Sequence, residues 1–307
     1  MSWSTTFPLK GAGGEPVDLW RTIVSHGVAD LPPNRIDEDA RRLETTLALP
    51  RGKPQTVLVR EGRGRTGFLE ASGNEAQAKP LLTAVEHVLR LDEDLSEFYA
   101  LAREDPDLSW VEGGSGRLMR SQTVFEDVVK TICTTNCAWS GTVRMVNAVV
   151  EHLGEPASGA PREGPYGRAF PTPAAMAAAP EDFYRHVARA GYRDAYLRSL
   201  SESVASGEVD LEELGHASPE ELPDDEVAAR LLALPGVGPY AAAHVMLLVG
   251  RYSRLVLDSW TRPKFASLNG GKPVKDAAIE RRFRGYGRYA GLAFWLFLTR
   301  DWVAEPV

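Results

Sequence analysis

The hydrophobic pattern of this chain changes its period near residue 81, and that change limits the folds the chain can adopt. Before this point apolar and polar residues alternate, as over residues 43–49, and Gly- and Pro-rich turns separate the runs. Beyond it apolar residues recur every three or four positions. Alternation is typical of half-buried strands, and the longer period is typical of amphipathic helices. The sequence therefore predicts an α+β fold, with an antiparallel β-sheet domain at 1–80 and an all-α region at 81–307.

The same patterns place individual elements. Strands are expected at 17–20, 43–49, 56–59 and 67–69. Helices are expected at 81–89, 95–101, 125–132, 143–150, 173–179, 180–189, 192–205 and 225–233. The polar stretch 134–137 should join two antiparallel helices, and the Gly- and Pro-rich stretch 154–167 should form a long surface loop.

Composition excludes several classes of protein. The 307 residues are 43% hydrophobic and 25% charged, which allows a sizeable core and excludes whole-chain disorder. No apolar run approaches the roughly 18 residues that a membrane span needs. The N-terminus shows no secretory signal, and two cysteines, Cys133 and Cys137, are too few for a disulfide framework or a four-thiolate metal site. We therefore expect a cytoplasmic protein with no membrane partner.

Charge is distributed unevenly along the chain. The net charge is −7, yet residues 228–302 carry 12 Lys and Arg against four acidic residues. Residues 1–227 carry 23 basic and 37 acidic residues. Because screening makes nearby charges count most, the basic segment could bind phosphate groups on an otherwise acidic protein.

A short segment, Leu-Pro-Gly-Val-Gly-Pro-Tyr, lies between two helical runs at 234–240. Gly236 and Gly238 allow a sharp turn and a close approach of the backbone to another group. The free N–H groups at the start of the second helix form an anion site, and with duplex DNA the anion would be a phosphate. An ordinary helix–helix turn could have the same sequence, so this segment alone does not distinguish a DNA-binding hairpin from such a turn.

A single acidic residue, Asp258, ends an apolar run twenty residues after Gly238. An isolated Asp in such a place is commonly a helix N-cap. Its spacing from the hairpin favours a second role, in which partial burial holds the carboxylate in a fixed position for chemistry.

The hairpin and Asp258 together resemble the helix-hairpin-helix DNA glycosylase superfamily, base-excision repair enzymes in which a hairpin precedes a catalytic Asp. Further similar segments are 116–126 and 132–136 (8-oxoguanine glycosylases), 289–302 (bacterial alkylpurine glycosylases), and 170–173 and 191–197 (both branches). The resemblance covers about residues 110–302. It implies a helix-hairpin-helix glycosylase domain at 81–307, whose last helix could pack back on the N-terminal part.

The activity implied by the resemblance is that of a monofunctional DNA glycosylase. Such an enzyme flips a damaged base out of the duplex and hydrolyses its N-glycosidic bond. Cleavage builds positive charge on the sugar, and a fixed carboxylate, here Asp258, would stabilise it. Bifunctional relatives carry a Lys two residues after the second hairpin Gly; this chain has Tyr240 there, which cannot form a Schiff base. No AP-lyase activity is expected.

The substrate is less closely defined. Tyr240 and the similarity of 289–302 favour alkylated purines, since an aromatic residue at that position could stack on a cationic base. The similarity of 116–126 and Asn136 favours an 8-oxoguanine-type substrate instead. A third alternative is a non-catalytic DNA-damage-binding protein, which would not need Asp258.

The resemblance also assigns residues to the base pocket and to DNA. The expected base-pocket residues are Tyr240, Trp260, Cys137 and His26. The expected DNA contacts are Pro235, Gly236, Val237, Gly238, Arg262, Lys264 and Asn136, whose side chain would fill the space left by the flipped base. Simpler interpretations stay open: internal packing for Tyr240 and Cys137, an exposed loop position for His26, and helix capping for Asn136.

The resemblance also implies which cofactors and partners to expect. The superfamily commonly holds a monovalent cation through hairpin carbonyls, which correspond to Leu234, Gly236 and Val237 here. No organic cofactor or catalytic metal is expected, because no cluster of His, Cys or carboxylate residues has ligand spacing. The expected partner is double-stranded DNA with a damaged base, bound by a monomer.

Overall fold

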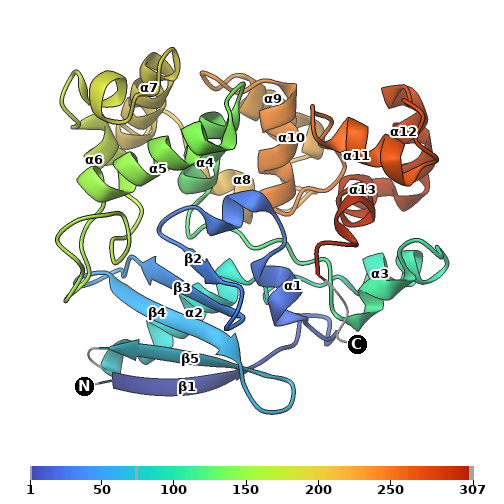
Figure 1. The fold of residues 1–307 in the computed structure, drawn as a ribbon, viewed down its shortest axis with the longest axis horizontal. Helices are drawn as coiled ribbons and strands as arrows, with labels where there is room; N and C mark the ends of the chain where they lie inside the picture. Colours follow the sequence, from blue (N-terminus) through green and yellow to red (C-terminus); the bar gives the residue numbers. More distant parts are fainter. Residues whose placement is uncertain (1, 73–74, 304–307) are drawn as a thin grey trace.

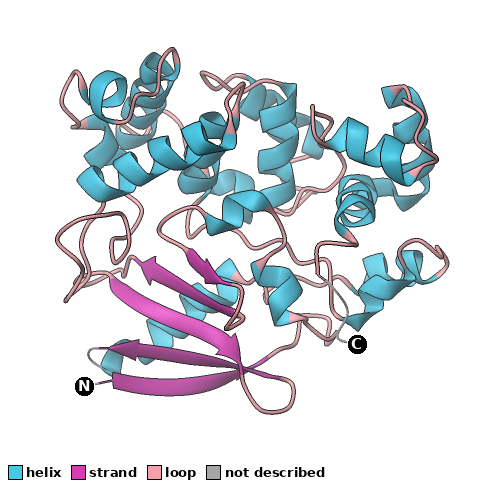
Figure 2. Cartoon of the chain, in the orientation of Figure 1, coloured by secondary structure: helices cyan, strands magenta, loops and turns pink. Residues whose placement is uncertain are grey.

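The computed structural model describes residues 2–72 and 75–303, and it contains an antiparallel sheet beside a larger body of helices (Figures 1 and 2). The five strands lie in the order β1-β5-β4-β3-β2. Their bounds are Ser2–Pro8 for β1, Arg35–Asp37 for β2, Arg42–Leu47 for β3, Gln55–Glu61 for β4 and Thr66–Ser72 for β5. The predicted α+β class is confirmed.

The strands predicted at 43–49, 56–59 and 67–69 correspond to β3, β4 and β5. The strand predicted at 17–20 is wrong. Asp18 there is an N-cap whose Oδ1 accepts a hydrogen bond from the Arg21 backbone N–H at 2.8 Å, and helix α1 (Leu19–Ile23) follows. The sequence analysis also missed β1, which pairs with β5 from Ser2 to Pro8.

The helical region begins close to the predicted change of period. Its α-helices are α2 (Ala78–Val88), α3 (Ser96–Arg103), α4 (Val124–Thr134), α5 (Trp139–Leu153), α6 (Pro173–Ala177), α7 (Arg193–Ala205), α8 (Glu212–His216), α9 (Asp224–Leu232), α10 (Pro239–Leu248), α11 (Thr261–Leu268), α12 (Asp276–Phe283) and α13 (Ala290–Thr299). The helix predicted at 180–189 is a single π-helical turn at Phe183–Val187, and α8, α11 and α12 were not predicted. Over the described residues, no helix combines the length and apolar character needed to cross a membrane.

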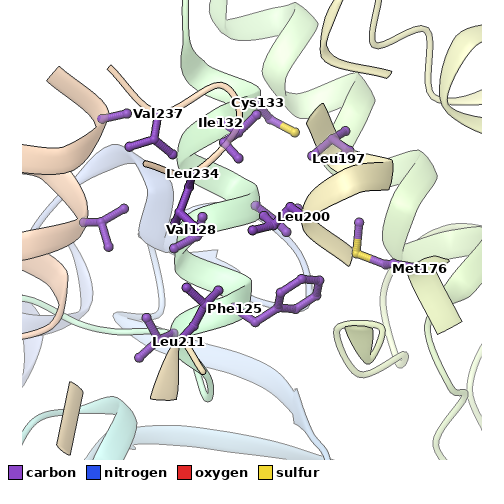
Figure 3. Close-up of a cluster of buried hydrophobic side chains, with 14 of the residues drawn as sticks. Phe125, Val128, Ile132, Cys133, Met176, Leu197, Leu200, Leu211, Leu234 and Val237 are labelled. Atoms are coloured by element: carbon purple, nitrogen blue, oxygen red, sulfur yellow. The ribbon is translucent and has the colours of Figure 1, made fainter. Parts of the chain in front are cut away.

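The hairpin between α9 and α10 is anchored in a hydrophobic core. Leu234 and Val237 are buried in the same cluster as the apolar face of α4. Figure 3 shows both side chains beside Val128 and Ile132 of that helix, with Leu197 and Leu200 of α7 across from them. Two apolar residues therefore fix the hairpin while its glycines remain at the turn.

Buried polar contacts connect the sheet to the helices. Arg90, just after α2, donates to the carbonyl oxygen of Leu118 at 3.0 Å and to that of Leu248 at the end of α10. Arg117 forms a buried ion pair with Glu15. On the sheet side, α2 packs against the strands through Leu81 and Val85. These contacts fix α2 relative to α10, and they fix the N-terminal loop that carries Glu15 relative to the segment that carries Arg117.

Candidate active site

Of the two hairpin glycines, Gly236 and Gly238, only the first has a backbone conformation that requires glycine. Gly236 has φ of 81°, and a Cβ there would lie 2.7 Å from the ring of Tyr196. Gly238 has φ of −97°, and a Cβ there would meet nothing within 4 Å. The turn is closed by the Val237 N–H, which donates to the carbonyl oxygen of Leu234 at 3.2 Å. The backbone thus needs Gly236 for folding, whereas Gly238 leaves open space at the start of α10.

Asp258 lies directly before α11 and is half-buried. Its Oδ1 accepts hydrogen bonds from the backbone N–H groups of Trp260 at 2.8 Å and Thr261 at 2.6 Å. In return the Asp258 N–H donates to Thr261 Oγ1 at 2.8 Å. Oδ2 has no hydrogen-bond partner among the residues that the structure describes. The carboxylate therefore caps the helix with one oxygen and is held still while the other remains available.

Tyr240 is in the first turn of α10. Its hydroxyl lies 3.3 Å from Thr134 Oγ1 at the end of α4, and its ring stacks on His244 with 6.0 Å between centroids. Burial raises the pKa of the Tyr240 phenol, and the charge of the Asp258 carboxylate adds to that rise. The phenol is thus protonated at neutral pH, and the hairpin helix and α11 bring these two side chains within electrostatic reach of each other.

An aromatic cluster extends from Tyr240 across the molecule. It consists of Tyr240, His244, His26, Trp295, Trp260 and Trp302. The His244 ring lies 6.1 Å from that of His26, and Trp260 lies 5.8 Å from Trp295 and 5.6 Å from Trp302, between ring centroids. Three predicted pocket residues, Tyr240, Trp260 and His26, therefore belong to one cluster. Trp295 and Trp302 were not predicted to belong to it.

A cavity of about 490 Å³ opens beside this cluster, where the N-terminal loops face the helices. We call it the interdomain cavity; its lining includes Trp20, His26, Asp30, Glu38, Trp139 and Trp302. The volume is in the range of small-molecule sites in proteins. His26 is buried rather than exposed, against the simpler interpretation of a loop histidine.

Cys137 does not line the interdomain cavity. Its side chain packs against the apolar core, beside Gly141. Trp139, two residues later, lines the cavity instead and comes close to Gly27, where an added Cβ would lie 3.7 Å from the indole ring. The only sequence signal for Trp139 was an aromatic residue just after a polar turn, which a core position would also explain.

The loop between α4 and α5 presents Asn136 to solvent. Asn136 has a left-handed φ of 43°, which Asn tolerates better than most residues. Its Nδ2 lies 3.4 Å from the hydroxyl of Tyr192. Buried Arg193 donates to the carbonyl oxygens of Ile132 and Thr135 and so fixes the loop. Asn136 is thus an exposed side chain on a braced loop.

The basic segment is largely neutralised by ion pairs. Arg262 contacts Asp276 at 2.8 Å and Lys264 contacts Asp301 at 2.6 Å. Arg230, Arg251, Arg254, Arg282, Arg288 and Arg300 also pair with carboxylates. Within the described part of 228–302, the basic residues without an ion pair are Lys272, Lys275, Arg281 and Arg284. The net positive field is therefore weaker than the sequence count indicates.

The hairpin carbonyls proposed as cation ligands are only partly free. The Leu234 carbonyl oxygen already accepts the Val237 N–H, although a carbonyl can accept twice. No group of three or more His, Cys, Asp or Glu residues suited to a metal ion is found in the described ranges. A monovalent cation at Leu234, Gly236 and Val237 stays a prediction.

No family model matches the sequence, and no curated protein matches it. Solved structures do match. A 3-methyladenine DNA glycosylase from Archaeoglobus fulgidus is 18% identical, with a TM-score of 0.73 over 98% of this chain and 100% of that one. An 8-oxoguanine glycosylase/lyase from Clostridium acetobutylicum, in its apo form, is 22% identical, with a TM-score of 0.70 over 96% and 95%.

The same Clostridium acetobutylicum enzyme in complex with double-stranded DNA containing cytosine opposite 8-oxoguanine is 23% identical, with a TM-score of 0.69 over 93% of this chain and 92% of that one. At these identities the likeness concerns the fold. It extends over the sheet as well as the helices, which the sequence resemblance did not. The chain has the fold of the helix-hairpin-helix DNA glycosylases.

Proposed function

We propose that this chain is a monofunctional DNA glycosylase of base-excision repair that removes alkylated purines from duplex DNA. The observation that carries the proposal is the pairing of Asp258 with Tyr240. A carboxylate fixed by two backbone N–H groups lies within electrostatic reach of a phenol that occupies the place of the lyase amine. Duplex DNA as the partner is supported by the DNA-bound structure of the same fold.

The reaction follows from this arrangement. The flipped nucleotide loses its base as the C1′–N bond breaks, and a water oxygen forms the new bond to C1′. Oδ2 of Asp258 stabilises the positive charge on the sugar or accepts the proton of the attacking water, while Oδ1 stays bound to the start of α11. A base that carries a positive charge from alkylation leaves as a neutral molecule with the electron pair of the broken bond. The proton of the water passes to Asp258 and then to solvent, and the product is an abasic site.

Tyr240 explains why the enzyme would leave the DNA strand uncut. Cleavage of the strand by a lyase requires an amine that attacks C1′ and forms a Schiff base. A protonated phenol cannot do this, and the nearby amine of Lys264 is held by Asp301. Strand scission should therefore need added alkali.

The interdomain cavity favours a cationic base. Trp139 and Trp302 line this cavity together with Arg41, and indole rings can form cation–π contacts with a positively charged base. The carboxyl groups of Asp30 and Glu38 also line this cavity, and two carboxyl groups against the one guanidinium of Arg41 favour a cation. Burial raises the pKa of Asp30, which works against its negative charge. Alkylation at a purine ring nitrogen creates such a cation. An 8-oxoguanine-type substrate is the second candidate, favoured by the braced Asn136 loop beside Tyr192.

A panel of duplexes with single lesions tests the proposal. The lesions are 3-methyladenine, 7-methylguanine, 1,N6-ethenoadenine, hypoxanthine, 8-oxoguanine and uracil, each assayed with and without alkali, using wild type and Asp258→Asn. Alkali-dependent scission at methylated purines, lost in the variant, is the expected result. Scission without alkali would contradict the assignment of Tyr240. Binding without excision of any lesion would indicate a damage-binding protein instead.

A further inference from the structure

Arginines are concentrated around the exposed loop between α4 and α5, within the acidic part of the chain. Residues 134–150 and 183–201 together contain a single acidic residue, Asp194. Their arginines are Arg144, Arg185, Arg189, Arg193 and Arg198. The two segments are in contact, because Arg193 donates to the carbonyl oxygens of Ile132 and Thr135. The excess of acidic residues over 1–227 therefore hides a local cationic surface.

Two of these arginines are exposed and have no ion pair within the described residues. They are Arg144 on α5 and Arg189, which follows the π-helical turn. Arg144 Nη2 donates to the carbonyl oxygen of Arg189 at 3.4 Å, so the two residues are neighbours. The others are engaged: Arg185 is paired with an acidic residue, and Arg193 and Arg198 donate to backbone carbonyl oxygens. Arg144 and Arg189, here called the arginine pair, are the cations that can bind an external anion.

Arg189 also has a backbone conformation that arginine does not favour. Its φ is 54°, in the left-handed region that Gly and Asn adopt more readily. A residue held there costs on the order of 1 kcal/mol, and such positions cluster at functional sites. The local backbone therefore does not explain why an arginine occupies this position.

A row of side chains leads from the hairpin to the arginine pair. Tyr196 lies against Gly236, where an added Cβ would be 2.7 Å from its ring. The ring of Tyr192 lies 5.9 Å from that of Tyr196, between centroids, and Tyr192 is 54% exposed. Its hydroxyl lies 3.4 Å from Asn136 Nδ2. Arg189 comes three residues before Tyr192, on the side of the chain away from Tyr196.

This order suits the two strands of a DNA duplex. A groove is bordered by the phosphate backbones of both strands, so side chains that enter it have one strand on each side. The start of α10 is the expected contact to one backbone. Across the exposed Asn136 and Tyr192, the arginine pair then faces the other backbone. A guanidinium without a protein partner can bind a phosphate through two parallel hydrogen bonds.

We propose that the arginine pair binds phosphates of the strand opposite the damaged base, while the hairpin binds the damaged strand. Binding then depends on a complementary strand, which makes the protein selective for duplex over single-stranded DNA. An acidic protein segment would meet the same cations, but the row continues into the hairpin, which the proposed function assigns to DNA. The identity of the partner as duplex DNA is taken from the proposed function, on which this inference rests.

Binding to one oligonucleotide in duplex and single-stranded form tests the arginine pair without any chemistry. The oligonucleotide carries a fluorescent label and a tetrahydrofuran abasic analogue, and Kd is measured by anisotropy over a range of salt concentrations. For Arg144→Gln with Arg189→Gln, the slope of log Kd against log salt should fall by about 2 on the duplex. On the single strand it should stay unchanged. An equal fall on both forms, or none on the duplex, would overturn the inference.

Neutral methylphosphonate linkages identify the strand that the arginine pair contacts. Placed in the complementary strand, they should weaken binding by wild type and have little effect on the double variant, because the contacts they remove are already lost. Placed in the damaged strand, they should weaken both proteins to the same extent. The reverse pattern would assign the arginines to the damaged strand and contradict the proposal.

Arg103→Gln with Arg185→Gln is the matched control. It removes the same charge from two exposed arginines that are paired with Glu112 and Asp194. Both salt slopes should stay close to those of wild type. If this control lowered the duplex slope as much as the test variant, net charge would explain the effect and the arginine pair would have no special role. Thermal unfolding of each variant verifies that it is folded.

The lesion panel separates this inference from the proposed function. A duplex-specific effect of the arginine pair without excision of any lesion would remove the glycosylase assignment and leave the two-strand contact in place. Excision of methylated purines, with binding that ignores Arg144 and Arg189, would do the reverse.

Discussion

At the scale of single residues, Asp258 binds the backbone before α11 with one carboxylate oxygen and leaves the other oxygen available. The sequence alone allows a capping interpretation and a catalytic interpretation of this residue. The structure reconciles their requirements, because the cap uses Oδ1 alone. The local fold at α11 thus holds the carboxyl group at a fixed place.

Because the two oxygens of Asp258 have different roles, Asp258→Asn should lower the activity without lowering the stability of the protein. The amide oxygen can still accept from the N–H groups of Trp260 and Thr261, so the free energy of unfolding should change little. Loss of the negative charge should slow base excision by roughly 10²–10³-fold in single-turnover assays. Asp258→Ala should be equally slow and also lose about 1 kcal/mol of stability, because the cap is gone. An active Asn variant would exclude a catalytic Asp258.

At the scale of elements, the hairpin was predictable because its signals are local. Gly236, Pro239 and the flanking apolar residues specify a turn within a few positions, and α10 begins at Pro239, a first-turn position that proline tolerates. The interdomain cavity was not predictable in this way. Trp20, Trp139 and Trp302 come from distant parts of the chain and share a cavity only through the tertiary fold. Helix α1 was missed because a single cap, Asp18, outweighed a strand-like run.

The two hairpin glycines should respond differently to alanine. Gly236→Ala places a Cβ in a left-handed residue against Tyr196, so it should destabilise the protein by about 1–3 kcal/mol and weaken duplex binding with it. Gly238→Ala should leave the unfolding free energy nearly unchanged, since the space around it is open. A duplex-binding defect in Gly238→Ala would then report close approach of DNA to the backbone. Equal destabilisation by both would contradict this geometry.

Helix α11 offers a test of the DNA face. Arg262→Gln with Lys264→Gln removes two cations that are also engaged with Asp276 and Asp301. If both contact phosphates, the slope of log Kd against log salt should fall by about 2, measured by fluorescence anisotropy. Lys272→Gln with Lys275→Gln is the comparison, because those amines have no ion pair within the described residues. A slope that changes only in the second variant would place the DNA face on the 270–275 loop.

At the scale of the whole molecule, an N-terminal loop and the helical region meet at a pair of neutral histidines. His26 comes from an N-terminal loop and His244 from α10, with ring centroids 6.1 Å apart. Burial lowers the pKa of His26 to about 3 and that of His244 to about 4, from an ordinary value of 6.5. Protonating either would place a charge inside the contact between the two regions.

Acid should therefore weaken this contact. Between pH 6.5 and 4 the unfolded chain binds more protons than the folded protein at these two positions, so stability falls as the pH falls. Each histidine contributes up to about 1.4 kcal/mol per pH unit. Burial raises the pKa of Asp127 to about 6, and this carboxyl acts in the opposite direction over part of the range.

Urea unfolding of wild type and of a His26→Phe, His244→Phe double variant at pH 7, 6 and 5 measures the effect. The variant should lose less stability than wild type between pH 7 and 5, because two of the groups that take up protons on unfolding are gone. The exposed His186, replaced by Phe in a control, should leave the wild-type slope intact. If the unfolding free energy of the double variant fell with pH as steeply as that of wild type, the acid sensitivity would arise from other groups. The histidine pair would then not be the cause of the pH dependence.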